Sequence, residues 1–313
     1  MTPVPLPPSP APRECSPDHH LVPADQHHER PLVYALALTA SFCLIELGGG
    51  LWTRSLALIA DSMHMAVDVL ALVLALFATV AAAKPADERR TFGYKRVEVL
   101  AALGNGIGLM VLTGFILREA LARLAHPHPI NAQGMLLISS FGLVSNIASG
   151  FFLYAPSRQN INMRGAFLHV GADALGSLAA IAAAAVILKT HWLQADSVAG
   201  ILISAGIIFT AFWLLRDSTS ILLESAPPHL DIDEIRAALA AIPGVREVHD
   251  LHLWSLSPGY EFMSGHIVAE ESVDRDALLD AARRDLTGRF GLSHVTLQVE
   301  GKAVAERSGG GKR

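Results

Sequence analysis

Charged side chains are scarce in this sequence of 313 residues. Asp, Glu, Lys and Arg make up 17% of it, 51% of the residues are hydrophobic, and the mean hydropathy is +0.39. A soluble globular domain cannot cover so much apolar surface, which excludes most soluble classes. There are 24 basic and 29 acidic residues, which gives a net charge of −5. The chain therefore has no excess of positive charge with which to bind a nucleic acid backbone. The sequence predicts a membrane protein with no nucleic acid partner.

Cysteine is almost absent as well. Cys15 lies in a proline-rich stretch and Cys43 in an apolar one, and two cysteines so placed form neither a disulfide framework nor a zinc ribbon. The HExxH motif of zinc proteases is also missing. These absences argue against redox chemistry and against an intramembrane metalloenzyme, so we expect that the protein is not an enzyme.

Long apolar runs are what the sequence does contain. Residues 1–30 are rich in proline and histidine and lack apolar periodicity, which predicts a disordered tail. A six-helix transmembrane domain is expected over residues 31–225, because six runs follow that are each near the ~20 residues needed to cross a hydrocarbon core. The runs cover 32–51, 56–83, 97–117, 130–155, 165–188 and 197–215.

The distribution of Lys and Arg predicts the orientation of these helices. With the N-terminus inside, the inner segments hold nine basic residues and the outer segments four, and an excess of positive charge marks the cytoplasmic side. The inner nine are Arg13, Arg30, Lys84, Arg89, Arg90, Lys95, Arg96, Arg158 and Arg164; the outer four are Arg54, Arg118, Arg123 and Lys189. We therefore expect both termini in the cytoplasm, with the inner membrane of the cell as the location.

The composition changes after the sixth run. From Ser225 onward there are 10 basic and 14 acidic residues, a local charge of 10 − 14 = −4, as in a small soluble domain. Turn and periodicity signals predict a helix from Asp231 to about Ile242, strands over 245–256 and 261–269, a helix over 274–289 and a strand over 294–300. This order, αββαβ, predicts a compact cytoplasmic α+β domain over residues 226–302, followed by a disordered tail over 303–313.

Two His-x-x-x-Asp pairs carry the functional signal. His64 and Asp68 lie in the second apolar run, and His169 and Asp173 in the fifth. A spacing of four places both side chains on one face of a helix. If the two faces meet, two nitrogens and two oxygens form a tetrahedral site that suits Zn²⁺. Two carboxylates within a bilayer are costly, and a divalent cation would compensate them.

An alternative is that these side chains only bond helices together through hydrogen bonds. Against it, the same spacing occurs twice, 105 residues apart, in the second and fifth of six helices. Such repetition is typical of secondary transporters built from two inverted halves, whose substrate site lies near the membrane midplane.

The sequence resembles the cation diffusion facilitators, in particular their zinc-exporting branch. The resemblance rests on SLALIADSMHMAVD (55–68), RTFGYKRVEVLAALGN (90–105), FLHVGAD (167–173) and, near the C-terminus, HDLHLW and HVTLQVE. It implies a six-helix bundle with a cytoplasmic ferredoxin-like domain, a homodimer, and export of Zn²⁺ in exchange for H⁺. It places His64, Asp68, His169 and Asp173 at the family's transport site, and replacing His64 by Asp is expected to broaden the metal preference.

The resemblance also suggests further sites. Arg96 and Glu224 match a charge pair that ties the membrane and soluble parts together, although both could be solvated interfacial charges. His249, His266 and Glu300, with Gln298 nearby, match positions that bind a regulatory Zn²⁺ in the cytoplasmic domain. Strand alternation alone would place His249 on one face with Leu251 and Leu253. Some relatives bind zinc in the second inner loop, but here Asp87 remains while Arg90 and Tyr94 replace the histidines.

Asp61 precedes His64 by three residues on the same helical face. Asp61 could lie beside the metal ligands or on the path of the ion to them. Alternatively, it could only form local hydrogen bonds near the start of the helix.

Proton coupling follows from the chemistry of the expected ligands. An imidazole must be neutral to bind metal, and its unperturbed pKa of ~6.5 lies near physiological pH. We hypothesise that His64 and His169 carry the protons. A membrane-embedded metal sensor in which no ion crosses is the remaining alternative, and an intramembrane metalloenzyme is disfavoured because four protein ligands leave no position for water.

Overall fold

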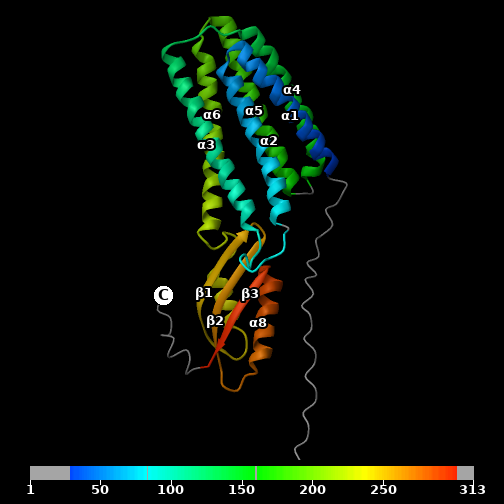
Figure 1. Cartoon of the computed structure of the whole chain (residues 1–313), viewed down its shortest axis with the longest axis vertical. Coiled ribbons are helices and arrows are strands. Elements are labelled where there is room, and N and C mark those ends of the chain that lie inside the picture. Colours follow the sequence, from blue (N-terminus) through cyan, green and yellow to red (C-terminus); the bar gives the residue numbers. More distant parts are fainter. Residues whose placement is uncertain (1–28, 83, 159–160, 302–313) are drawn as a thin grey trace, which may run out of the picture.

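The computed structural model describes residues 29–82, 84–158 and 161–301, and consists of a long helical bundle above a small α+β domain (Figure 1). The expected tails, except residues 29 and 30, lie outside the described residues. The bundle contains six long helices, which are α1 (Glu29–Thr53), α2 (Leu56–Ala82), α3 (Arg96–Ala125), α4 (Ala132–Ser157), α5 (Ile161–Thr190) and α6 (Gln194–Leu222).

These helices confirm the predicted fold class of the membrane domain. Each predicted run falls within one helix apart from residues 130 and 131, which precede α4, and residue 83, which lies outside the described residues; several helices extend beyond their runs. Within the described residues, four stretches are long and apolar enough to cross a membrane: Arg96–Ala125, Ala132–Ala155, Phe167–Thr190 and Gln194–Leu222. Six crossings remain a prediction.

In the bundle, α3 and α6 form one group of helices and α1, α4 and α5 another, and α2 contacts both groups. α3 lies along α6, α4 lies along α5, and α1 contacts both α2 and α4 (Figure 1). Glycines permit two of these contacts, since a Cβ at Gly49 would clash with Ile138 of α4, and one at Gly106 would lie 2.9 Å from Leu215 of α6. α2 contacts α1, α3, α5 and α6, which places its polar residues at the centre of the bundle.

The C-terminal domain has the predicted αββαβ order. Its elements are α7 (Ile232–Ala240), β1 (Val245–Ser257), β2 (Tyr260–Ala269), α8 (Arg275–Phe290) and β3 (His294–Glu300). Asp231 and Asp274 cap the two helices by accepting backbone N–H bonds, as their side-chain chemistry favours. β2 is the central strand, antiparallel to β1 and parallel to β3. One sheet face packs with both helices in a core that includes Leu253, Met263 and Leu286.

A β-bulge in β1 corrects the simple alternation. His249 pairs with His266 and His252 pairs with Ser264, so β1 has one extra residue between the two pairs. Asp250 lies within this bulge with φ of 51°, in the left-handed region that Asp tolerates better than most residues. The expectation that His249 shares a face with Leu251 and Leu253 is therefore wrong. His249 faces away from the core, on the side of His266, because the bulge shifts the alternation by one residue.

Candidate metal centre

The helix that carries His64 begins at an unusual cap. Asp196, at the start of α6, is fully buried and accepts three hydrogen bonds from the start of α2. Ser55 Oγ donates to its Oδ1 at 2.6 Å, Leu56 N–H donates to its Oδ2 at 2.6 Å, and Ala57 N–H donates to its Oδ1 at 3.2 Å. The first N–H groups of a helix lack intrahelical partners, so a carboxylate from another helix satisfies them here. Asp196 thus fixes where α2 starts relative to α6.

Four side chains from α2 and α5 converge further into the bundle, about two to three turns beyond the start of α2. His64 Nε2 lies 3.4 Å from Asp68 Oδ2 and 3.8 Å from Asp173 Oδ1. His169 Nε2 lies 3.2 Å from Asp68 Oδ2 and 3.8 Å from Asp173 Oδ2. The two imidazole centroids are 5.7 Å apart. The structure therefore brings all four predicted residues together, two from each helix.

These separations suit a tetrahedral zinc ion. Bonds of 2.0–2.1 Å give a tetrahedron with edges of about 3.3 Å, close to the observed N···O distances of 3.2 to 3.8 Å. The ligand atoms of His64, Asp68 and His169 all lie within 4.8 Å of one another, whereas Asp173 lies outside this group and approaches the two imidazoles through different oxygens, each at 3.8 Å. Asp68 Oδ2 and Asp173 Oδ1 are buried without a hydrogen-bond partner, which leaves their lone pairs for a cation.

Exposure differs across the four ligands. The side chain of His169 is 46% exposed and that of Asp68 22%, whereas Asp173 is only 2% exposed. A cavity of about 410 Å³ between α2, α5 and α6 reaches His64 and Asp173 and is otherwise lined mostly by apolar residues. Asp173 is therefore the most buried of the four ligands, whereas His169, the most exposed, is not among the residues that line this cavity.

Asp61 lines the same cavity one turn before His64 and is 2% exposed. Gly176 of α5 makes room for it, since a Cβ there would lie 2.8 Å from Asp61 Oδ1. The structure thus places Asp61 beside the metal ligands but not among the group of close ligand atoms. Glu46 of α1 is also fully buried.

A second candidate metal cluster lies on the face of the sheet opposite its helices. His266 Nδ1 is 3.1 Å from Glu300 Oε1, His249 Nε2 is 3.7 Å from Glu300 Oε2, and the two rings are 5.3 Å apart. Glu300 is 2% exposed, and its Oε2 has no hydrogen-bond partner. Gln298 donates to Glu300 Oε1 at 2.6 Å, which orients the carboxylate. These three side chains, a nitrogen–nitrogen–oxygen set, fit a zinc ion.

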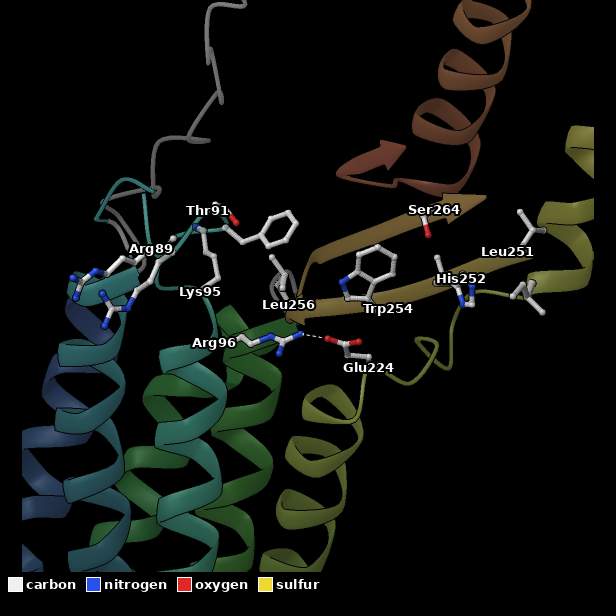
Figure 2. Close-up of a pocket in the computed structure, with 15 residues that line it drawn as sticks. Arg89, Thr91, Lys95, Arg96, Glu224, Leu251, His252, Trp254, Leu256 and Ser264 are labelled. Carbon is white, nitrogen blue, oxygen red and sulfur yellow. Dashed lines mark hydrogen bonds and ion pairs between the residues drawn. The ribbon is translucent and has the colours of Figure 1, made fainter. Parts of the chain in front are cut away.

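An ion pair within the bundle and an aromatic contact to the C-terminal domain lie where the two domains meet. Arg96 Nη2 donates to Glu224 Oε1 at 2.7 Å, linking the start of α3 to the end of α6 (Figure 2). Phe92, in the loop between α2 and α3, packs edge-on against Phe262 of β2, with ring centroids 5.4 Å apart, and reaches His294 of β3 at 6.4 Å. The loop therefore contacts both strands that carry His266 and Glu300.

Asp87 has a structural role in this loop. It accepts N–H bonds from Arg90 and Arg89 at 2.7 and 2.8 Å and a hydroxyl bond from Tyr94 at 3.1 Å. The backbone bonds from Arg90 and then Arg89 hold the pKa of Asp87 below its ordinary value. Its oxygens are engaged in the turn, and the positions of the missing histidines hold Arg90 and Tyr94.

Sequence reasoning missed two of these positioning residues. The sixth apolar run begins at residue 197, which leaves Asp196 outside the predicted helix. The carboxylate could have been noticed as an acid at a helix start, but its partners lie some 140 residues away. Phe92 lies within the RTFGYKRVEVLAALGN segment, but an exposed loop phenylalanine gives no signal of its contact.

The fold and the sites define a membrane protein with candidate sites for divalent metal ions in both of its domains. A family profile described as the cation efflux transmembrane domain matches residues 32–223, and one described as the cytoplasmic domain of cation efflux proteins matches 227–302. The chain therefore belongs to the cation efflux family, which confirms the resemblance and the expected class of transporter. The second profile is named as a dimerisation domain, in agreement with the expected homodimer.

Curated relatives are similar over most of their length. The zinc transporter ZitB of Escherichia coli K12 is 40% identical over 278 residues, 88% of each chain. The metal cation efflux system protein CzcD of Cupriavidus metallidurans is 39% identical over 274 residues, 87% of each. A cadmium, cobalt and zinc/H⁺-K⁺ antiporter of Bacillus subtilis is 35% identical, covering 88% of this chain and 90% of that protein. Among solved structures, the metal-bound C-terminal domain of CzcD is 33% identical and covers 23% of this chain and 99% of its own, with a TM-score of 0.22.

Proposed function

We propose that this protein exports Zn²⁺ from the cytoplasm in exchange for protons and binds the ion through His64, Asp68, His169 and Asp173. The observation that carries the proposal is the convergence of two imidazoles and two carboxylates between α2 and α5, with N···O separations of 3.2 to 3.8 Å. Relatives named as zinc transporters and as a zinc/H⁺-K⁺ antiporter support both the metal and the exchange.

Competition for the ligands couples the two ions. An imidazole that binds zinc must be neutral, so metal and proton exclude one another at His64 and His169. If the site faces the two sides of the membrane alternately, zinc leaves where protons enter. In the inward orientation that we assign to this structure, the half-exposed His169 faces the entry route from the cytoplasm.

Contacts near the other end of the helices support this orientation. Ala184 and Ile187 of α5 share an apolar cluster with Ala195 and Ala199 of α6, which closes the bundle at the end remote from the C-terminal domain. The segment between α2 and the start of α3 carries five of the nine basic residues expected on the cytoplasmic side. Both termini would then be cytoplasmic, and the inner membrane of the cell would be the location.

In the C-terminal domain, His249, His266 and Glu300 would hold a regulatory Zn²⁺, and Arg96 with Glu224 would tie the two domains together. The transport role assigns no catalysis to the chain, because four protein ligands around the membrane ion leave no position for an attacking water.

Zinc transport by the purified protein in liposomes tests the proposal. Uptake driven by a proton gradient is expected for the natural chain and expected to be lost in Asp173→Ala, while Asp217→Ala, an exposed acid on α6, serves as a matched control. Unchanged uptake in Asp173→Ala would refute the site, and no zinc movement in the natural chain would favour a sensor. Proton flux that persists in a His64→Ala, His169→Ala double variant would contradict the coupling.

A further inference from the structure

A large cavity lies between the bundle and the C-terminal domain, separate from both metal clusters. Its volume is about 860 Å³, and it is bounded by the loop before α3, the end of α6, and strands β1 and β2 (Figure 2). Trp254 and Ser264, whose side chains carry an indole N–H and a hydroxyl, are among its lining residues. The cavity is therefore large enough for a small polar group and is lined by hydrogen-bond donors.

Its lining is strongly cationic. Arg89, Arg90, Lys95 and Arg96 all border the cavity, and Glu224 is the one carboxylate among its lining residues. Glu224 engages only Nη2 of Arg96, whose Nε is buried without a partner. Arg90 forms an ion pair with Asp87, and Lys95 lies over the ring of Tyr260 at 4.0 Å. No ion pair to Arg89 or Lys95 is found within the described residues, so at least two positive charges remain uncompensated here.

The start of α3 adds to this positive potential. The helix begins at Arg96, and its N-cap residue Lys95 makes no side-chain capping bond. The amino end of a 30-residue helix carries partial positive charge and attracts anions. Glu98, the acid in this first turn, does not line the cavity.

The position of the cavity indicates the kind of anion. The cavity lies beside the start of α3 and the end of α6, where the apolar helices give way to the C-terminal domain (Figures 1 and 2). If these helices cross the membrane, the cavity lies near its inner surface. Guanidinium groups match the oxygens of a phosphate in a bidentate geometry, and basic pockets at the inner membrane surface suit anionic headgroups. We propose that this cavity binds a phosphodiester, supplied by the headgroup of an anionic phospholipid. A soluble phosphate ester would present the same group.

Lipid binding to the purified full-length protein in uncharged detergent tests the proposal. Native mass spectrometry and thermal unfolding would follow titration with dioctanoyl phosphatidylglycerol, dioctanoyl phosphatidylcholine and glycerol 3-phosphate. The variant is Arg89→Gln with Lys95→Gln. The control, Arg118→Gln with Lys189→Gln, removes two exposed charges at the other end of the bundle.

We expect phosphatidylglycerol to bind more tightly than phosphatidylcholine, and the cavity variant to weaken it about 10-fold or more while the control does not. Equal binding of glycerol 3-phosphate, lost in the same variant, would keep the anion site but assign it to soluble esters. Equal affinity for both lipids, or the same loss in variant and control, would overturn the proposal. So would a variant that dissociates the dimer without altering lipid binding, because the cations would then belong to the subunit interface.

Discussion

Ser55 and Asp196 are 141 residues apart in sequence, yet their side chains are hydrogen-bonded at 2.6 Å in the interior of the bundle. Through this bond and two backbone N–H groups, α6 caps the helix that carries His64 and Asp68. The position of two proposed zinc ligands along the membrane normal thus depends on a residue of another helix.

Replacing Asp196 by Ala is expected to destabilise the protein by about 2 kcal/mol or more. The change removes a helix cap and leaves the Ser55 hydroxyl and two buried N–H groups without partners. Thermal unfolding in detergent measures the loss, with Asp217→Ala as the control on the same helix. Equal melting temperatures for the two variants would show that the cap contributes nothing. Asn should rescue part of the loss, since its carbonyl oxygen can accept one of the bonds.

Replacing His64 by Asp is expected to reduce discrimination between Zn²⁺ and Mn²⁺. The change exchanges an imidazole for a carboxylate, a ligand that suits harder ions. Competition by Mn²⁺ during zinc uptake into liposomes measures the change. Competition identical to that of the natural chain would show that His64 does not contact the ion.

Replacing Glu300 by Gln is expected to remove one bound zinc per chain without preventing folding. The measurement needs a background in which Asp68→Ala and Asp173→Ala disable the membrane site, so that zinc content reports on the C-terminal domain. Glu270→Gln, an exposed residue just after β2, is the matched control. Zinc content that is equal in the two variants would contradict the proposed ligand set.

Replacing Phe92 by Ala is expected to loosen the loop between α2 and α3. Edge-on aromatic contacts contribute about 0.5–1.5 kcal/mol, and Phe92 is 54% exposed, so the lower end of that range applies. Trypsin cleavage after Arg89 or Arg90 should become roughly 2- to 3-fold faster. Phe141→Ala on the exposed surface of α4 provides the comparison, and equal cleavage rates for the two variants would mean that the contact does not hold the loop.

The turn around Asp87 should be stable to mild acid. The folded pKa of Asp87 is lower than its unfolded value because Arg90 and Arg89 donate backbone N–H bonds to the carboxylate. Its contribution is therefore complete above the ordinary Asp pKa of ~3.9 and is lost as the pH falls through the lowered value. Hydrogen exchange of residues 84–95, corrected for intrinsic rates, should stay constant from pH 8 to 5. Asp87→Asn should accelerate exchange over this whole range.

The sequence predicts the fold well because its signals are local. Apolar runs, capping residues such as Asp231 and Asp274, and alternation in β3 each depend on neighbouring residues, and the structure has those elements. The face of His249 could not be predicted, because a bulge at Asp250 shifts β1 by one residue relative to β2. The contacts of Asp196 and Phe92 depend on how distant segments meet, and a single sequence carries no measure of that. The four membrane residues were recognisable because their spacing occurs twice.

The division of the proposed zinc ligands between α2 and α5 has a mechanical consequence. Each helix contributes one imidazole and one carboxylate, so neither helix alone supplies four ligands. Metal–ligand distances tolerate deviations of only about a few tenths of an ångström. A tilt that separates α2 from α5 by more than this tolerance would open the proposed coordination site, while the hydrogen bonds within each helix stay intact. Release of the ion would then need no local unfolding of either helix. The energy needed to tilt one helix against the other would determine how readily the ion is released.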